Sequence, residues 1–188
     1  MKALAQIIIL VTVAVQTLAQ NLDMDYIVRC NDVLRTMKLV DRNTPAGDVY
    51  LSRREEWGRG LRDGGILPYK PVMCYRRATA DNNAPVVDSV YLSQKDVDYI
   101  FNTLSERYTE AFRAKLCNAF GMIAREPDSL DLMAGYTTLT APVFLHDNEV
   151  CVVYRQRESF ESHSGGLEVY KKEREGWVWV QELMRHAR

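Results

Sequence analysis

The sequence lacks the short motifs that identify many catalytic and cofactor-binding chains. It contains no G-x-S-x-G nucleophile elbow, no phosphate-binding loop with a Lys-Ser/Thr ending and no C-x-x-C pair. Histidine, the commonest general base, occurs three times. These absences argue against serine-hydrolase, nucleotide-binding, zinc-ribbon and thioredoxin-type chemistry, and we expect no cofactor.

The chain also lacks a surface of one charge sign. Its 24 Lys and Arg residues nearly balance 25 Asp and Glu residues, which gives a formal net charge of −1. The densest basic stretch, residues 53–62, is interleaved with Glu55 and Glu56. Nucleic-acid binding requires a basic patch with little acid in it, so we expect no nucleic-acid partner.

The one long hydrophobic run lies at the N-terminus. Lys2 precedes the mostly apolar stretch 3–15, and a small-x-small cleavage site ends at Ala19. This order is typical of a cleavable signal peptide over residues 1–19. A membrane anchor is the alternative, but an anchor needs roughly 20 apolar residues. We therefore expect a single domain over residues 20–188, exported to the periplasm or the exterior without stable membrane insertion.

The first half of the exported chain gives mixed signals. Residues 22–39 place apolar side chains at helical spacing and predict a first helix. Residues 47–85 contain repeated glycines and prolines and are predicted to be irregular, a length of loop that usually indicates function or a wrong assignment. Residues 86–92 predict a strand.

The strongest local signal predicts one long amphipathic helix over residues 93–116. Ser93 and Asp96 match the capping-box pattern, and Leu92 and Val97 are placed to form a hydrophobic staple. The positions that follow form one apolar stripe, which is typical of a core face. The stripe consists of Val97, Ile100, Phe101, Leu104, Tyr108, Ala111 and Phe112.

The C-terminal part changes to an alternating pattern that predicts four strands. Turn-forming residues at 146–148 and 174–176 join strands as hairpins. The fold class predicted is α+β, with an antiparallel meander sheet packed against the 93–116 helix and an additional N-terminal helix. The four predicted strands cover residues 142–145, 149–157, 166–172 and 176–183.

Four cysteines lie in the predicted domain, and in an exported chain an even number permits two disulfides. The disulfide candidates are Cys30, Cys74, Cys117 and Cys151. We expect at least one bond, and burial as free thiols is the alternative. Cys151 lies in an apolar run, which favours burial. On a helix that continues past residue 116, Cys117 points nearly opposite the apolar stripe, so either the helix ends before it or it is a disulfide candidate.

Several short motifs occur together in the C-terminal third. They are Ala141-Pro142-Val143-Phe144 with Asp147, Val152-Val153-Tyr154, Gly165-Gly166-Leu167, Val169-Tyr170-Lys171-Lys172 and Gly176-Trp177. In these motifs the chain resembles a set of uncharacterised exported bacterial proteins of unknown function. Those relatives typically carry two Cys-Gly dipeptides before the third strand, whereas residues 158–166 here contain no cysteine. The resemblance implies the sheet and export, and it does not point to any particular activity.

The candidate metal-binding side chains lie in the predicted loop 158–166 and are Glu158, Glu161 and His163. A histidine with two carboxylates can hold a hard or borderline metal ion, although solvated surface side chains are the commoner outcome. Ser162 or Ser164 beside His163 would supply a hydrolase nucleophile. Close neighbours in one loop generally cannot align a hydroxyl with an imidazole.

Two functions of different classes follow from these patterns. The favoured one is a non-enzymatic exported protein that binds or inhibits another macromolecule, an envelope protein or a glycan. The alternative is a small hydrolase or metal-dependent enzyme that uses the 158–166 loop. Trp177 and Trp179 suit either a sugar-binding platform or core packing, and a ligand pocket between helix and sheet rests on architecture alone.

Overall fold

A computed structural model describes most of the predicted domain. The predicted signal peptide, residues 1–19, lies outside the described residues, as do residues 52–70 of the segment predicted to be irregular. The described ranges are 24–37, 48–51, 71–79, 81, 83–105, 110–120, 122 and 133–187.

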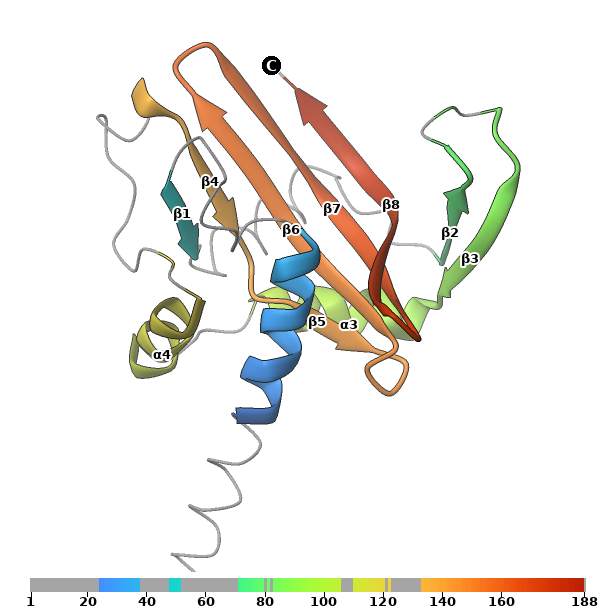
Figure 1. Cartoon of the computed structure of the whole chain (residues 1–188), viewed down its shortest axis with the longest axis horizontal. Coiled ribbons are helices and arrows are strands. Elements are labelled where there is room, and N and C mark those ends of the chain that lie inside the picture. Colours follow the sequence, from blue (N-terminus) through green and yellow to red (C-terminus); the bar gives the residue numbers. More distant parts are fainter. Residues whose placement is uncertain are drawn as a thin grey trace, which may run out of the picture.

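The chain folds around one curved, mostly antiparallel sheet (Figure 1). Its strand order is β1-β4-β6-β7-β8, and β5 pairs with the first part of β6. The β1–β4 pair is parallel, and β2 and β3 form a separate antiparallel hairpin. The strands are β1 (Asp48–Leu51), β2 (Val72–Arg77), β3 (Val86–Leu92), β4 (Tyr136–Leu139), β5 (Val143–Leu145), β6 (Val150–Ser159), β7 (Ser162–Glu173) and β8 (Gly176–Ala187).

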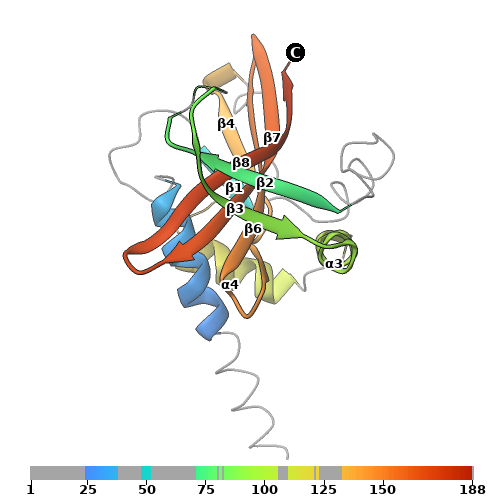
Figure 2. The ribbon, with the colours of Figure 1, turned by 90° about the vertical axis from the view of Figure 1, so that its right-hand side faces the viewer.

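Helices cover both faces of this sheet. Residues 24–36 form an N-terminal helix, as predicted, and α3 (Gln94–Ser105) and α4 (Glu110–Phe120) follow later in the chain. Figure 2 shows the N-terminal helix and α3 on opposite sides of the sheet. Within the described ranges, no helix combines the length and the apolar character needed to cross a membrane.

The central strand β6 is buried on both sides, because successive residues of a strand point to opposite faces. Val150, Val152 and Tyr154 belong to a first core cluster with α3 and the β2–β3 hairpin. Cys151 and Val153 belong to a second cluster with the N-terminal helix and α4. The predicted α+β class is therefore confirmed.

The start of α3 forms as its sequence predicts. The Ser93 N–H donates to Asp96 Oδ2 at 2.8 Å, and the Asp96 N–H donates to Ser93 Oγ at 3.3 Å. This reciprocal capping box satisfies backbone donors that a helix start leaves without partners. The stripe on α3 is buried in the first cluster together with Leu92, and consists of Val97, Ile100, Phe101 and Leu104.

A single helix over residues 93–116 is not confirmed. The structure describes α3 and α4 as separate elements, and residues 106–109 between them lie outside its described part. Leu116 and Cys117 of α4 are buried in the second cluster, whereas α3 packs into the first. The sequence left open whether the helix ends before Cys117 or turns it away from the buried face. Cys117 lies within α4, which packs its own face against the second cluster.

Two segments predicted to be loops contain strands. The segment 47–85 includes β1 and β2. The predicted loop 158–166 is a hairpin, with β6 running to Ser159 and β7 starting at Ser162. Gly165 explains part of this miss, because a Cβ there would lie 2.9 Å from the Tyr154 hydroxyl. A glycine that looks like a loop residue is instead required for close packing within the sheet.

The two hairpin turns of the C-terminal sheet are confirmed. His146, Asp147 and Asn148 have positive φ angles of 50°, 55° and 68°. Histidine, aspartate and asparagine are the non-glycine residues that adopt this left-handed region most readily. Gly176, with φ of 131°, follows the turn between β7 and β8. These turns fix how β6, β7 and β8 pair.

The four cysteines are buried free thiols. Cys74 packs in the first cluster, and Cys30, Cys117 and Cys151 pack in the second. The predicted disulfide is therefore not supported. These side chains act as small apolar residues of the core, a common role for cysteine.

Candidate functional site

The three predicted metal ligands do not form a described metal site. Glu158 accepts a hydrogen bond from the Tyr136 hydroxyl at 2.7 Å and another from the Gln156 amide. Glu161 is exposed in the β6–β7 turn. His163 pairs with Glu158 in the β6–β7 ladder, but its side chain lies outside the described part. Among the described residues, no group of three or more metal-binding side chains is found.

Two further sequence candidates have structural roles. The Ser162 hydroxyl lies 2.9 Å from the Ser159 hydroxyl, where it closes the hairpin turn. Trp177 is buried in the second cluster, with its ring 5.7 Å from the Phe144 ring, whereas Trp179 is half-exposed. Core packing therefore explains Trp177, and the two indoles do not expose a joint platform.

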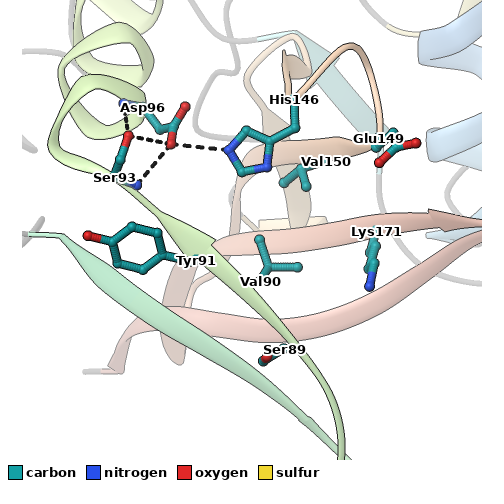
Figure 3. A pocket seen from close by; sticks show the side chains of 9 residues that line it. All are labelled: Ser89, Val90, Tyr91, Ser93, Asp96, His146, Glu149, Val150 and Lys171. Carbon is teal, nitrogen blue, oxygen red and sulfur yellow. Dashed lines mark hydrogen bonds and ion pairs between the residues drawn. The ribbon is translucent and has the colours of Figure 1, made fainter.

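The structure instead shows a hollow of about 570 Å³ where three elements meet. These are strand β3, the start of α3 and the turn between β5 and β6, with one side chain added from β7 (Figure 3). Val90 and Val150 are buried, so they form an apolar floor between polar walls. The lining residues are Ser89, Val90, Tyr91, Ser93, Asp96, His146, Glu149, Val150 and Lys171.

One wall of the hollow is a hydrogen-bonded group of three side chains. Asp96 Oδ2 lies 2.6 Å from the Ser93 hydroxyl, which donates to it, and 3.1 Å from His146 Nε2. Burial acts to raise the pKa of Asp96, but its hydrogen bonds with Ser93 and His146 outweigh burial, so this pKa lies below its ordinary value. Asp96 is therefore charged at neutral pH and holds His146 in place.

The other wall carries an ion pair. The Lys171 ammonium donates to both carboxylate oxygens of Asp88, at 2.9 and 2.8 Å. The hydrogen bond from Lys171 is the main cause that lowers the pKa of Asp88. The pair links β3 of the hairpin to β7 of the main sheet, and it places charged groups at the edge of the hollow.

The hollow combines hydrogen-bonding side chains with an apolar floor. The Ser93 hydroxyl bonds to Asp96 and not to His146, so the nucleophile-to-base hydrogen bond of a catalytic triad is not formed. His146 Nδ1 points into the hollow, toward Val150 (Figure 3). The arrangement offers a ring nitrogen, a carboxylate of Glu149 and an apolar floor to an incoming group.

A second feature adjoins the hollow on the outside of the β2–β3 hairpin. The inner side chains Cys74, Val90 and Leu92 are buried, whereas the alternate side chains face solvent. We call these solvent-facing side chains the outer hairpin face. They are Met73, Tyr75, Val87 and Tyr91, which are 40%, 45%, 53% and 53% exposed. Tyr91 belongs both to this face and to the hollow.

Searches of protein-family models, curated proteins and solved structures find no match to this chain.

Sequence reasoning missed most of this site. It placed Asp96 in a helix cap and His146 in a surface turn, and both placements are right locally. Their contact joins positions that are fifty apart, which no short-range pattern reveals. One signal was available for the outer hairpin face: the predicted strand 86–92 is apolar at Val87 and Tyr91 as well as at Val90 and Leu92, so both of its faces carry apolar side chains.

Proposed function

We propose that the chain is an exported, non-enzymatic protein that acts by binding another protein through the outer hairpin face. The observation that carries the proposal is the exposure of four large apolar or aromatic side chains on one side of two paired strands. Contiguous apolar surface on a soluble domain often marks an interaction site, and tyrosine and methionine are enriched at such interfaces.

The hairpin is held firmly enough to present this face. The Tyr75 N–H donates to the Gln181 side chain at 2.8 Å, and Arg76 forms an ion pair with Glu173 at 2.7 Å. The Lys171–Asp88 pair adds a third link to the main sheet. A surface that is ordered before binding loses less conformational entropy in the complex.

Export rests on the N-terminal pattern of the sequence and on the resemblance to exported bacterial proteins. The periplasm or the cell exterior is the proposed location, and an envelope protein is the proposed partner. The alternative of a hydrolase or metal-dependent enzyme at residues 158–166 gains no support from a described group of ligands.

Capture experiments test the proposal with matched variants. The full chain is expressed in its source cells and recovered from the envelope and external fractions, where its intact mass should begin at Gln20. Tyr75→Ser with Tyr91→Ser should lower recovery of the co-purifying protein about tenfold. Phe160→Ser, which removes an exposed aromatic ring in the β6–β7 turn, should leave recovery unchanged.

Two results would contradict the proposal. Recovery of the intact precursor from the cytoplasm alone would exclude export. The outer hairpin face would be excluded as a protein-binding surface if the wild-type chain, the double tyrosine variant and Phe160→Ser captured the partner equally well. Capture of a glycan in place of a protein would exclude it too.

A further inference from the structure

The outer edge of β3 has backbone groups that point away from its partner strand. Tyr75 and Ser89 are paired across the hairpin, yet the Tyr75 N–H donates outward to Gln181. In an antiparallel pair of strands, every second pair of opposite residues forms no hydrogen bonds between the two strands, and Tyr75 and Ser89 are such a pair. The same holds two residues along for the pair of Met73 and Tyr91. The N–H and C=O groups of Ser89 and Tyr91 consequently point away from β2.

One of these outward groups already has a local partner. The Ser89 N–H donates to the Asp88 carboxylate at 2.7 Å. Within the described part of the chain, no hydrogen bond is found for the Tyr91 N–H or for the carbonyls of Ser89 and Tyr91. An edge of this kind is a template on which another extended chain can pair.

The hollow lies beside this edge. Ser89, Val90 and Tyr91 line it from β3. His146, Val150 and Lys171 lie across β3 from β2, and Val90 points toward them (Figure 3). A third strand of the hairpin sheet would therefore run along the hollow, with alternate side chains pointing to its floor. The hollow is large enough for one or two such side chains, because its volume is about 570 Å³.

The charges around the hollow favour a basic side chain. Asp88 and Asp96 have lowered pKa values and are charged at neutral pH, and Glu149 adds a third, exposed carboxylate. Lys171 is already paired with Asp88. Lys171 is the one Lys or Arg among the described lining residues, so an incoming Lys or Arg complements the carboxylates of Asp96 and Glu149.

We propose that an extended segment of the partner protein pairs with β3 as a third strand and places a Lys or Arg side chain in the hollow. This inference rests on the proposed binding function and specifies the chemistry of the partner. Main-chain hydrogen bonds would supply the affinity, and the hollow would select the side chain, as in other cases of strand addition.

Short synthetic peptides test this directly on the wild-type full-length chain. The probe is the acetylated and amidated peptide Thr-Val-Thr-Lys-Thr-Val-Thr, compared with a version that has Glu in place of Lys. Amide NMR should show shifts centred on Tyr91 and Ser89 with the Lys peptide. The Glu peptide should bind about tenfold more weakly, and Glu149→Gln should reduce this difference.

Backbone methylation of the peptide provides a control that leaves the protein unchanged. N-methyl groups at the positions that face β3 should abolish binding, whereas methyl groups at the alternate positions should not. Equal loss with both methylation patterns, equal binding of the Lys and Glu peptides, or shifts away from β3 would overturn the inference.

The outcomes separate this inference from the proposed function. If a partner protein is captured through Tyr75 and Tyr91 but the peptides do not bind at β3, strand addition fails and the binding function stands. If the peptides bind at β3 but no partner depends on the outer hairpin face, the proposed function fails.

Discussion

His146 Nε2 and Asp96 Oδ2 lie 3.1 Å apart, although the two residues are fifty positions apart in the chain. The contact fastens the turn between β5 and β6 to the first turn of α3. It also uses the same carboxylate that caps the helix, so one side chain organises both the local helix start and one wall of the hollow.

The contact makes a prediction about stability. His146→Asn keeps a residue that tolerates positive φ but removes the imidazole, so the free energy of unfolding should fall by about 0.5–1 kcal/mol. Asp96→Asn should cost about 1 kcal/mol, because it also weakens the cap. In urea unfolding, the double variant should lose less free energy of unfolding than the two single variants lose together. Asp147→Asn, in the same turn, serves as a control and should have little effect. Full additivity would show that the contact contributes nothing.

The lowered pKa values of Asp88 and Asp96 predict how stability depends on pH. Both carboxyls have an ordinary pKa of 3.8 and a lower value in the folded chain. Their stabilisation is therefore fully present above about pH 5 and is lost as the pH falls through the folded pKa values. Urea unfolding between pH 7 and pH 2.5 should show this decline. Asp88→Asn and Asp96→Asn should each flatten it, and a decline that is unchanged in both variants would refute the assignment.

Gly165 should not tolerate a side chain. An added Cβ would lie 2.9 Å from the Tyr154 hydroxyl and 3.2 Å from the Arg155 carbonyl oxygen. Gly165→Ala should therefore lower the free energy of unfolding by about 1–3 kcal/mol. Removing the nearest atom with Tyr154→Phe should make the same substitution less costly. If Gly165→Ala lowers the free energy of unfolding equally with Phe and with Tyr at position 154, the hydroxyl is not the atom that limits the space.

The burial of the thiols is measurable with a thiol reagent. Burial raises the pKa of Cys74 to about 12 and that of Cys151 well above its ordinary value, and the thiolate is the reactive form. In the native protein, Cys30, Cys74, Cys117 and Cys151 should all react slowly with Ellman's reagent. After unfolding without reductant, all four should react quickly. If only two of the four thiols react after unfolding, the other two form a disulfide, which would contradict the four free thiols of the structure.

Local chemistry determined which parts of the fold were predictable. Ser93 and Asp96 are three residues apart, so the capping box was visible in the sequence, and the turn at His146 followed from its own residue types. The strand β4 was missed, because its Thr137 and Thr138 are polar yet buried by tertiary packing. The long loop at 158–166 was wrong because a polar, glycine-containing stretch forms a paired hairpin.

The candidate site was less predictable than the fold, because its residues are far apart in the sequence. The hollow assembles side chains from β3, α3, the β5–β6 turn and β7, so each appears in the sequence as a separate surface residue. The outer hairpin face required β2, which lies in the segment that was predicted to be irregular. Pairing of Met73 with Tyr91 across the hairpin joins two exposed positions into one surface.

Photo-crosslinking in the source cells tests the central proposal most directly. A benzophenone amino acid replaces Tyr75 or Tyr91 on the outer hairpin face, and Phe160 in the β6–β7 turn provides the exposed control. The account predicts that positions 75 and 91 crosslink to the same exported protein, identified by mass spectrometry, and that position 160 does not. Absence of a crosslinked protein from positions 75 and 91, or the same protein from all three positions, would contradict it.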